Sequence, residues 1–384
     1  MDPTTTCCPN LACPARGQAG EGNMRLHSRK DQRFLCTACH KTCSATQGTA
    51  LSRLRTAVET MTLVVTLLAH GCPPQAIVVA FGFDERTVAR WRARAGVHGQ
   101  AVQEHLVEPP RDLGQVQADE LRVKTQGGIG WMALAMMVRT RLRLAGEGSE
   151  QRDRTLIRRL IERVRRCAAH RAILFCTDGL CSYVRAIRET WRDPVHTGAH
   201  GRPRLRPWRN LCHRAGREAL RPAPRRRRRA PHRGGHARAR RDPQASLARG
   251  RGDQHRVQRA AEREFRERLA SLTRRGRALA RRTLTLQHGM YLIGTVYNFC
   301  TPHASLRLTG PMVGAPGVER TPAMAAGITD QCWTVQELLS FHVPTATLDP
   351  TQAPRAPLAG ATTPDCAVVF IVTTVNCGAT TWTG

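Results

Sequence analysis

The fold of this chain is decided by two short stretches, Val116-Gln117-Ala118-Asp119-Glu120-Leu121 and Ala172-Ile173-Leu174-Phe175-Cys176-Thr177-Asp178-Gly179. Each reads as an apolar strand that ends in an aspartate. Carboxylates carried by neighbouring strands can hold the same divalent metal ions. A lone aspartate after a strand is more often a turn former or a helix cap. The pair carries more weight, because we expect Asp119 and Asp178 on adjacent central strands as candidate catalytic residues and ligands of divalent metal ions.

The residues around these stretches predict an α/β (α+β) domain whose first half covers residues 112–211. Residues 116–124 and 129–138 read as two strands of a β-meander, and residues 139–144 as a third. Residues 155–169 are apolar at helical spacing. Residues 171–175 form a fully apolar strand, as expected for a strand covered on both faces, and a helix follows it as far as Trp191. Three antiparallel strands, a helix and a buried strand are typical of the start of a ribonuclease H-like mixed sheet with flanking helices.

The composition and net charge of the chain indicate which kind of molecule it binds. The chain has 384 residues, enough for two or three domains, and a formal net charge of +31 with a pI of about 11.3. Such a charge favours a polyanionic partner, most often nucleic acid, over a merely soluble basic protein. We find no apolar run of membrane-spanning length and no basic-then-apolar leader, so we expect no membrane and a cytoplasmic, nucleoid-associated protein. Fifteen cysteines in such a compartment indicate metal ligands or free thiols rather than disulfides.

The cysteines of residues 1–50 have the spacing of a zinc ribbon. Cys8 and Cys13 are separated by four residues, and Cys36 and Cys39 by two. Two short cysteine pairs on two turns suit tetrahedral Zn²⁺, and so small a core is not expected to fold without the metal. Cys7 is an equally placed alternative to Cys8. Four unrelated buried thiols are the competing interpretation, and a ribbon by itself is compatible with DNA or protein binding.

Residues 51–100 read as a helix-turn-helix. We expect helices over residues 56–69, 75–81 and 85–95, the last one N-capped by Asp84. A linker over residues 102–113 follows. The third helix is basic, and its candidate DNA-binding residues are Arg86, Arg90, Arg92 and Arg94. A short helix, a tight turn and a basic helix are the parts of a DNA-reading motif. A three-helix bundle with a solvated basic face is the alternative.

The order of these parts resembles that of the bacterial insertion-sequence transposases of the DDE class. The resemblance rests on the ribbon, the helix-turn-helix, Ala118-Asp119-Glu120, Thr177-Asp178-Gly179 and Tyr297-Asn298-Phe299-Cys300-Thr301-Pro302-His303-Ala304-Ser305-Leu306. The last segment is similar to the Tyr-Asn-x-x-x-Pro-His-x-x-Leu segment that follows the third acid of the family. The resemblance spans residues 8–345 with one gap. It implies structural zinc, catalytic magnesium held by three carboxylates, cleavage and transfer of element-end and target double-stranded DNA, a homo-oligomer on DNA, and His303 near the site.

The gap is the stretch 212–263, which has seventeen arginines against four acids and no periodic apolar pattern. The third acid of the family, a glutamate on a helix, is expected at position 259, where this chain has Arg259. The stretch is interpretable as a disordered basic arm that binds DNA, as an insertion, or, as we prefer, as a segment read out of frame. Shifting the reading frame by one base over residues 253–263 permits codons that restore a glutamate at position 259. The coding DNA would decide between these interpretations.

The chain as written therefore lacks one expected ligand, and we expect weak or absent strand transfer. Glu262, Glu264 and Glu267 are the nearby acids, and Glu262 is displaced by nearly a helical turn, which a metal site tolerates poorly.

Residues 264–345 are expected to complete the catalytic domain. They include a basic helical region over residues 265–287, an apolar helix over 290–299 packed under the sheet, and a turn and short helix over 321–341. Residues 346–384 form a low-order tail. A non-catalytic zinc-dependent DNA-binding regulator is the alternative function, and a degenerate copy that binds element ends without recombining them is a third.

Overall fold

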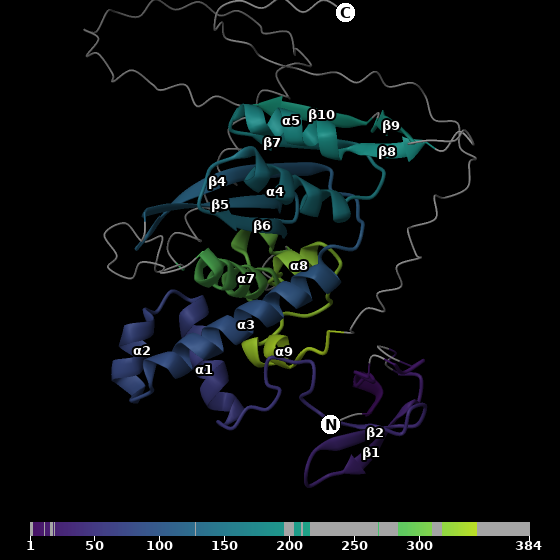
Figure 1. Ribbon diagram of the computed structural model, residues 1–384, viewed down its shortest axis with the longest axis vertical. Helices are drawn as coiled ribbons and strands as arrows, with labels where there is room; N and C mark the ends of the chain where they lie inside the picture. Colours follow the sequence, from purple (N-terminus) through teal and green to yellow (C-terminus); the bar gives the residue numbers. More distant parts are fainter. Residues whose placement is uncertain are drawn as a thin grey trace, which may run out of the picture.

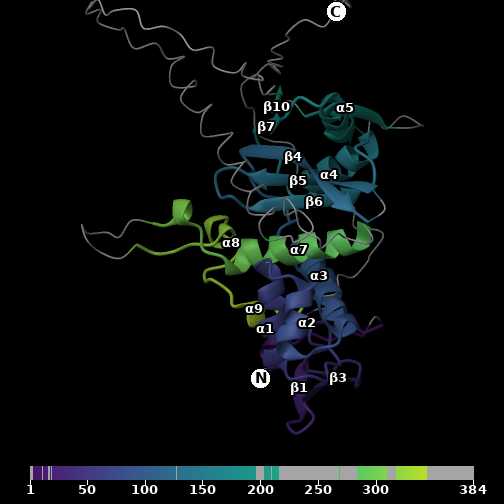
Figure 2. The same cartoon turned by 90° about the vertical axis from the view of Figure 1, so that its left-hand side faces the viewer.

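The computed structural model describes residues 3–10, 12–15, 18, 20–126, 128–195, 203–208, 210–215, 268, 283–308 and 317–343 (Figure 1). From the N-terminus, a small cysteine-bearing sheet is followed by three helices and then by a five-stranded sheet with helices on its faces. Figures 1 and 2 show α7 running between that sheet and the long helix α3, so the C-terminal part of the chain returns to join the two. The molecule is thus an α/β protein with two additional N-terminal parts.

The cysteine-bearing part is an antiparallel sheet made of β1 (Met24–Ser28), β2 (Arg33–Cys36) and β3 (Thr42–Ser44), preceded by the short turn η1 (Pro3–Thr5). Its core is small, and Phe34 is its one buried aromatic side chain among the described residues. It is tied to the rest of the chain near α9: Nε2 of His342 donates to the Ala45 carbonyl at 2.8 Å. A core of this size supplies little folding free energy by itself.

Three helices follow: α1 (Val58–Ala69), α2 (Pro74–Phe81) and α3 (Glu85–Leu106). The three expected helices are confirmed, and the Asp84 carboxylate caps α3 by accepting from two backbone N–H groups. The predicted end of the third helix at residue 95 is wrong, because α3 continues for eleven more residues through most of the first half of the expected linker.

Packing against α7 explains why α3 does not stop at its glycines. A Cβ atom on Gly96 would lie 2.5 Å from the His288 carbonyl oxygen of α7 (Thr283–Cys300), so only glycine allows the two helices to come this close. Val102, farther along α3, is fully buried. Glycine usually weakens the interior of a helix. Here the missing side chain of Gly96 lets α7 pack directly against α3.

The central sheet contains β4 (Gln115–Thr125), β5 (Gly128–Met137), β6 (Arg143–Ser149), β7 (Ile173–Thr177) and β10 (Leu211–Ala215), in the order β10-β7-β4-β5-β6. β4, β5 and β6 are antiparallel, whereas β7 runs parallel to β4 and β10 parallel to β7. The expected meander and buried strand are confirmed. The third strand was predicted over 139–144 and lies at Arg143–Ser149, because residues before it form the turn and the glycines Gly146 and Gly148 weaken its strand pattern.

The fifth strand corrects the expectation for the arginine-rich stretch. β10 takes up its first residues, and the backbone of Cys212 pairs with that of Leu174 in β7. His213 is buried beside Thr177, with Nε2 3.1 Å from the threonine hydroxyl. The stretch therefore begins inside the fold. The rest of it lies outside the described residues, as do Arg259, Glu262, Glu264, Glu267, most of the predicted basic helical region and the tail after residue 343.

Helices cover both faces of the sheet (Figure 2). α4 (Arg154–Arg166) buries the five apolar side chains that its sequence spacing predicts, namely Leu156, Ile157, Leu160, Ile161 and Val164, and α5 (Cys181–Thr190) packs beside it. On the other face, Met290 and Ile293 of α7 pack against Leu121 and Met132. The expectation of an apolar helix under the sheet is confirmed. The remaining elements are β8 (Arg192–Val195), β9 (Arg204–Pro207), η3 (Ala304–Leu306), α8 (Pro322–Ala325) and α9 (Val335–Ser340).

Candidate metal centres

Three carboxylates meet where β4 and β7 diverge. Asp119, Glu120 and Asp178 each offer an oxygen, and these oxygens all lie within 4.8 Å of one another. The topology explains the meeting. β7 pairs with β4 only as far as Gln117, so β4 continues past this point paired only with β5, and Asp178 directly follows the last residue of β7. Strands that run parallel bring their carboxyl ends to the same region of a sheet.

The two predicted aspartates are thus brought together, with one correction to their setting. Asp119 lies inside the eleven-residue strand β4 and not at its end. Asp178 combines the two roles that the sequence left open. Its Oδ1 accepts a hydrogen bond from the Leu180 backbone N–H at 3.0 Å and so shapes the turn before α5, while Oδ2 faces the carboxylate cluster. A turn-forming role and a ligand role are therefore compatible in this residue.

A guanidinium occupies part of this cluster. Nη2 of Arg152 donates to Glu120 Oε2 at 2.7 Å and to Asp178 Oδ2 at 3.0 Å, and Nε donates to the same Glu120 oxygen at 3.1 Å. Its Cζ lies 5.0 Å from the centre of the Trp131 ring, which adds a cation–π contact. The Glu120 side chain has no exposed surface, whereas those of Arg152 and Asp178 are about one-third exposed. Arg152 is therefore the counter-ion of a buried acid and reaches it from the solvent side.

Burial and neighbours act in opposite directions on Glu120. Burial raises its pKa above the ordinary value, while the Tyr183 hydroxyl and the Arg152 guanidinium favour the charged form. Tyr183 is fully buried beside this carboxylate, and burial together with the negative charge of Glu120 raises the pKa of Tyr183 well above its usual range. Glu120 and Arg152 were not identified as site residues from the sequence. Glu120 stood next to a candidate aspartate, but nothing in the local pattern shows that Arg152 reaches it from 32 positions away.

The donor set fits a hard divalent cation. Mg²⁺ takes oxygen ligands and binds through one or two carboxylates plus water or phosphate oxygens, and three carboxylates at this spacing provide enough of them. Two of the three are already in contact with Arg152. An ion that binds through Glu120 Oε2 and Asp178 Oδ2 would therefore take the place of the guanidinium at those oxygens.

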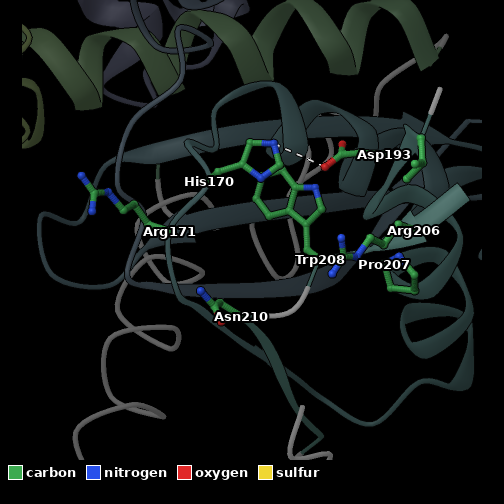
Figure 3. Close-up of a pocket in the computed structure, with 8 residues that line it drawn as sticks. His170, Arg171, Asp193, Arg206, Pro207, Trp208 and Asn210 are labelled. Carbon is green, nitrogen blue, oxygen red and sulfur yellow. Dashed lines mark ion pairs between the residues drawn. The ribbon is translucent and has the colours of Figure 1, made fainter. Parts of the chain in front are cut away.

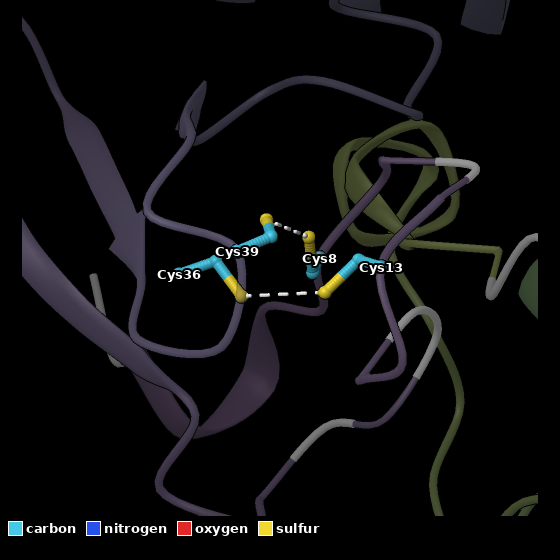
Figure 4. A group of neighbouring side chains, drawn as sticks. All are labelled: Cys8, Cys13, Cys36 and Cys39. Carbon is cyan, nitrogen blue, oxygen red and sulfur yellow. Dashed lines mark hydrogen bonds between the residues drawn. The ribbon is translucent and has the colours of Figure 1, made fainter.

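Four cysteine side chains form the second centre (Figure 4). The sulfurs of Cys8, Cys13, Cys36 and Cys39 lie within 4.8 Å of one another, with Sγ–Sγ distances of 3.6 Å for Cys8–Cys39 and 3.7 Å for Cys13–Cys36. A tetrahedral Zn²⁺ with Zn–S bonds of about 2.3 Å places its sulfurs about 3.8 Å apart. The residues therefore fit a structural zinc ion, and Cys8 rather than Cys7 belongs to the group.

The chemistry of the thiols agrees with a cation between them. Hydrogen bonds from the Asn10 side chain and the Lys41 backbone lower the pKa of Cys39 to about 6, so this sulfur is already largely a thiolate at neutral pH. Burial raises the pKa of Cys8 and of Cys13, which lie in the same cluster. Bound Zn²⁺ favours the thiolate form of each ligand. Cys7 and Cys43 are buried nearby, and burial raises the pKa of both.

The four candidate DNA-binding arginines of α3 divide into two pairs. Arg86 and Arg90 are exposed. Arg94 is half-buried and donates to the Ser52 carbonyl. Arg92 is half-buried near His288 of α7, and burial lowers its pKa. Only Arg86 and Arg90 are placed for contact with an external phosphate, because the long α3 turns the other two toward the protein.

The segment that carries the C-terminal part of the resemblance is structural where it is described. Asn298 is fully buried, and its side-chain amide exchanges two hydrogen bonds of 3.0 Å with the backbone of Arg143 on β6. Nδ1 of His303 accepts from the Ser305 N–H at 3.3 Å and so caps η3. Asn298 therefore fastens α7 to the sheet, and His303 shapes the turn after it.

Comparison of the sequence with protein-family models and with curated proteins gives no match. In the part of the chain that the structure describes, no helix combines the length and the apolar surface needed to cross a lipid bilayer. The carboxylate cluster and the cysteine cluster are therefore the basis on which a function can be assigned.

Proposed function

We propose that this protein is a DNA transposase of the DDE class, which binds element-end DNA and cleaves and transfers its strands with divalent metal at Asp119, Glu120 and Asp178. The observation that carries the proposal is the meeting of these three carboxylates on two neighbouring parallel strands. The order of three antiparallel strands, a helix and a parallel buried strand agrees with the ribonuclease H-like arrangement expected from the sequence. The net charge of +31 supports a polyanionic substrate.

Each residue of the cluster has a role in this proposal. Asp119 and Asp178, both partly exposed, present carboxylate oxygens to the ion and to the DNA backbone. Mg²⁺ would supply charge neutralisation at the phosphodiester and activation of the attacking oxygen. Glu120 holds the third position of the cluster, buried beneath it. In the metal-free site Arg152 keeps Glu120 and Asp178 together, and once the ion takes its place at these oxygens its exposed side would provide a positive charge next to the phosphate.

The same geometry supports the proposal that this copy is impaired. Position 259, where the resemblance implies the third acid, is an arginine. Glu120 is a different kind of ligand, because it is fully buried and neutralised by Arg152. We expect cleavage to be slow and strand transfer to be weaker still.

The second candidate is a zinc-dependent DNA-binding protein without catalysis. The Arg152 ion pairs favour it, since a guanidinium that bridges Glu120 and Asp178 satisfies these acids without any metal. In that case the carboxylates only stabilise the fold.

Cleavage of an element-end duplex in Mg²⁺ separates the two functions. For the transposase, Asp119→Ala is expected to lower the cleavage rate at least about 100-fold, because loss of a metal ligand removes several kcal/mol of transition-state stabilisation, while the Kd for the same duplex stays within about twofold. Asp112→Ala, which removes an exposed acid of the same domain, is the control and should leave the rate unchanged. Mg²⁺-independent cleavage, or equal rates in wild type and Asp119→Ala, would contradict the proposal.

A further inference from the structure

A second charged site lies at the opposite end of β7 from the carboxylates. A cavity of about 270 Å³ opens between the residues that precede β7, the β8–β9 hairpin and the turn that leads into β10 (Figure 3). Its lining includes the side chains of His170, Arg171, Asp193, Arg206, Trp208 and Asn210. A volume this small suits one phosphate group with part of a sugar, because pockets for drug-sized ligands start at about 300 Å³.

The floor of the cavity is rigid. The His170 ring stacks on Trp208 with 3.9 Å between ring centres, and the buried Trp208 packs edge-on against Trp191 at 4.7 Å. The guanidinium of Arg165 lies 5.1 Å from the centre of the Trp208 ring. Aromatic rings held on several sides lose little further freedom when a ligand binds above them. The cavity is thus a formed feature of the fold.

The one acid of the cavity is already neutralised. Asp193 pairs with Arg165, which does not line the cavity, and its other oxygen lies 3.4 Å from Nε2 of His170. A carboxylate with two cationic or hydrogen-bonding partners repels an incoming anion only weakly. The charge of the cavity is then set by its remaining cations.

Those cations are Arg171 and Arg206, which are both exposed and have no acidic partner within the described ranges. Figure 3 shows them on different sides of Trp208, the Arg206 guanidinium toward the ring and the Arg171 guanidinium directed outward, with Asn210 between them at the bottom of the view. The Asn210 carbonyl accepts the Ile173 N–H at 3.0 Å, so its backbone is fixed while its side-chain amide remains able to donate. The two guanidiniums provide only donors, the NH₂ group of the Asn210 amide can donate as well, and a phosphate provides only acceptors.

We propose that this cavity binds one backbone phosphate of DNA. Arg171 precedes β7 and Asp178 follows it, so seven positions of extended chain separate the two residues by up to roughly 23 Å. A single DNA strand covers that distance in about seven nucleotides. The cavity would hold the strand on one side of the carboxylate cluster and so fix which phosphate reaches it. This inference rests on the proposed function in taking DNA as the polyanion.

The salt dependence of DNA binding tests the inference in the zinc-loaded full-length protein. The affinity for a fluorescently labelled duplex is measured by anisotropy over a series of salt concentrations. The double variant Arg171→Ala/Arg206→Ala is expected to reduce the slope of log K against log salt by about 0.9, the value for one lost phosphate contact. The double variant Arg158→Ala/Arg185→Ala removes the same charge from exposed residues already paired with glutamates and is expected to keep the wild-type slope.

Three results would overturn the inference in distinguishable ways. Equal slopes in the two double variants mean that the cavity contacts no DNA phosphate, although the proposed function survives. A wild-type protein that does not bind duplex DNA removes the proposed function as well. Inorganic phosphate serves as the second probe: if phosphate alone raises the Tm of wild type but not of Arg171→Ala/Arg206→Ala, and the DNA slopes coincide, the cavity is a site for the free anion.

Discussion

The cysteine cluster and the carboxylate cluster both collect metal ligands from distant parts of the chain, yet their surroundings differ. The four thiols lie in a part of the molecule with three short strands, and no cationic side chain bridges them among the described residues. The three carboxylates lie on a five-stranded sheet with helices on both faces, and Arg152 bridges two of them. One cluster is therefore expected to depend on a metal for its fold, whereas the other carries its own cation.

The difference follows from core size and charge. The sheet that carries the carboxylates belongs to a core which extends from α1 to α9, so its fold does not require an ion. The ribbon buries Phe34 and a few small residues, and its thiolates would repel one another without a cation. Metal removal is thus expected to unfold the sheet that carries the cysteines and to leave the sheet that carries the carboxylates folded. Three experiments break or sharpen this comparison.

The largest effect is expected from Cys8→Ser. Loss of one of four ligands should release zinc and unfold residues 1–50, because zinc contributes about 10–16 kcal/mol to the folding of such small domains. Zinc content per chain and limited proteolysis of the N-terminal part measure the result. Cys7→Ser is the matched control, since Cys7 is buried next to the cluster but outside it, and it should retain one zinc per chain. Zinc loss in Cys7→Ser but not in Cys8→Ser would reverse the assignment.

An intermediate effect is expected from Arg152→Ala. Removing the counter-ion leaves Glu120 buried and unpaired, which costs about 1–3 kcal/mol once the partial exposure of Arg152 is taken into account. The Tm of the metal-free variant should fall, and Mg²⁺ should raise it more than it raises that of wild type, because the ion then replaces the guanidinium. Differential scanning fluorimetry with and without Mg²⁺ measures both.

Arg154→Ala is the matched control for that experiment. Arg154 lies two residues after Arg152 and pairs with Glu189, whose side chain is about one-third exposed. Its loss should cost less than about 0.5 kcal/mol and leave the Mg²⁺ response unchanged. If Mg²⁺ stabilises wild type and Arg152→Ala equally, Arg152 and the ion do not compete.

The smallest effect is expected from pH, and it belongs to the contact between α3 and α9 rather than to the cysteine-bearing sheet. Nε2 of His98 on α3 donates to the Leu338 carbonyl at 2.9 Å, and burial lowers the pKa of His98 below its ordinary value of 6.5. The unfolded chain then binds more protons than the folded one between these two pKa values. Stability should therefore fall as the pH falls through 6.5 toward the lower value.

His98→Gln should flatten that pH dependence, because the glutamine amide can donate to the same carbonyl and does not titrate. The exposed His27→Gln in the ribbon is the control and should keep the wild-type profile. Thermal unfolding between pH 5 and pH 7, roughly the range in which histidine titrates, measures the difference. A profile that His98→Gln leaves as steep as before would mean that other buried histidines carry the effect.

Much of the fold was predictable from the sequence because it depends on local periodicity. The apolar spacing of α4, the apolar run of β7 and the Asp84 cap of α3 each appear within a short window of residues. The errors occurred where a distant contact overrides the local pattern. Gly96 follows the predicted end of the third helix, but it lies inside α3 because it packs against α7. Gly146 weakens the strand pattern of β6, but it pairs with Leu134 of the neighbouring strand β5.

For the candidate sites, the sequence by itself determined which residue types are present and at what spacing: two aspartates after apolar stretches and two short cysteine pairs. Only the tertiary structure decided that Cys8 and not Cys7 joins the sulfur cluster, that Glu120 is the third acid of the carboxylates, and that Arg152 neutralises them. The physical reason is that hydrogen bonds and ion pairs act over a few ångströms in space, whereas Arg152 is 32 and 26 positions away from the two acids that it contacts. Such pairs leave no periodic signal along the chain, and they form only when the sheet brings its strands together.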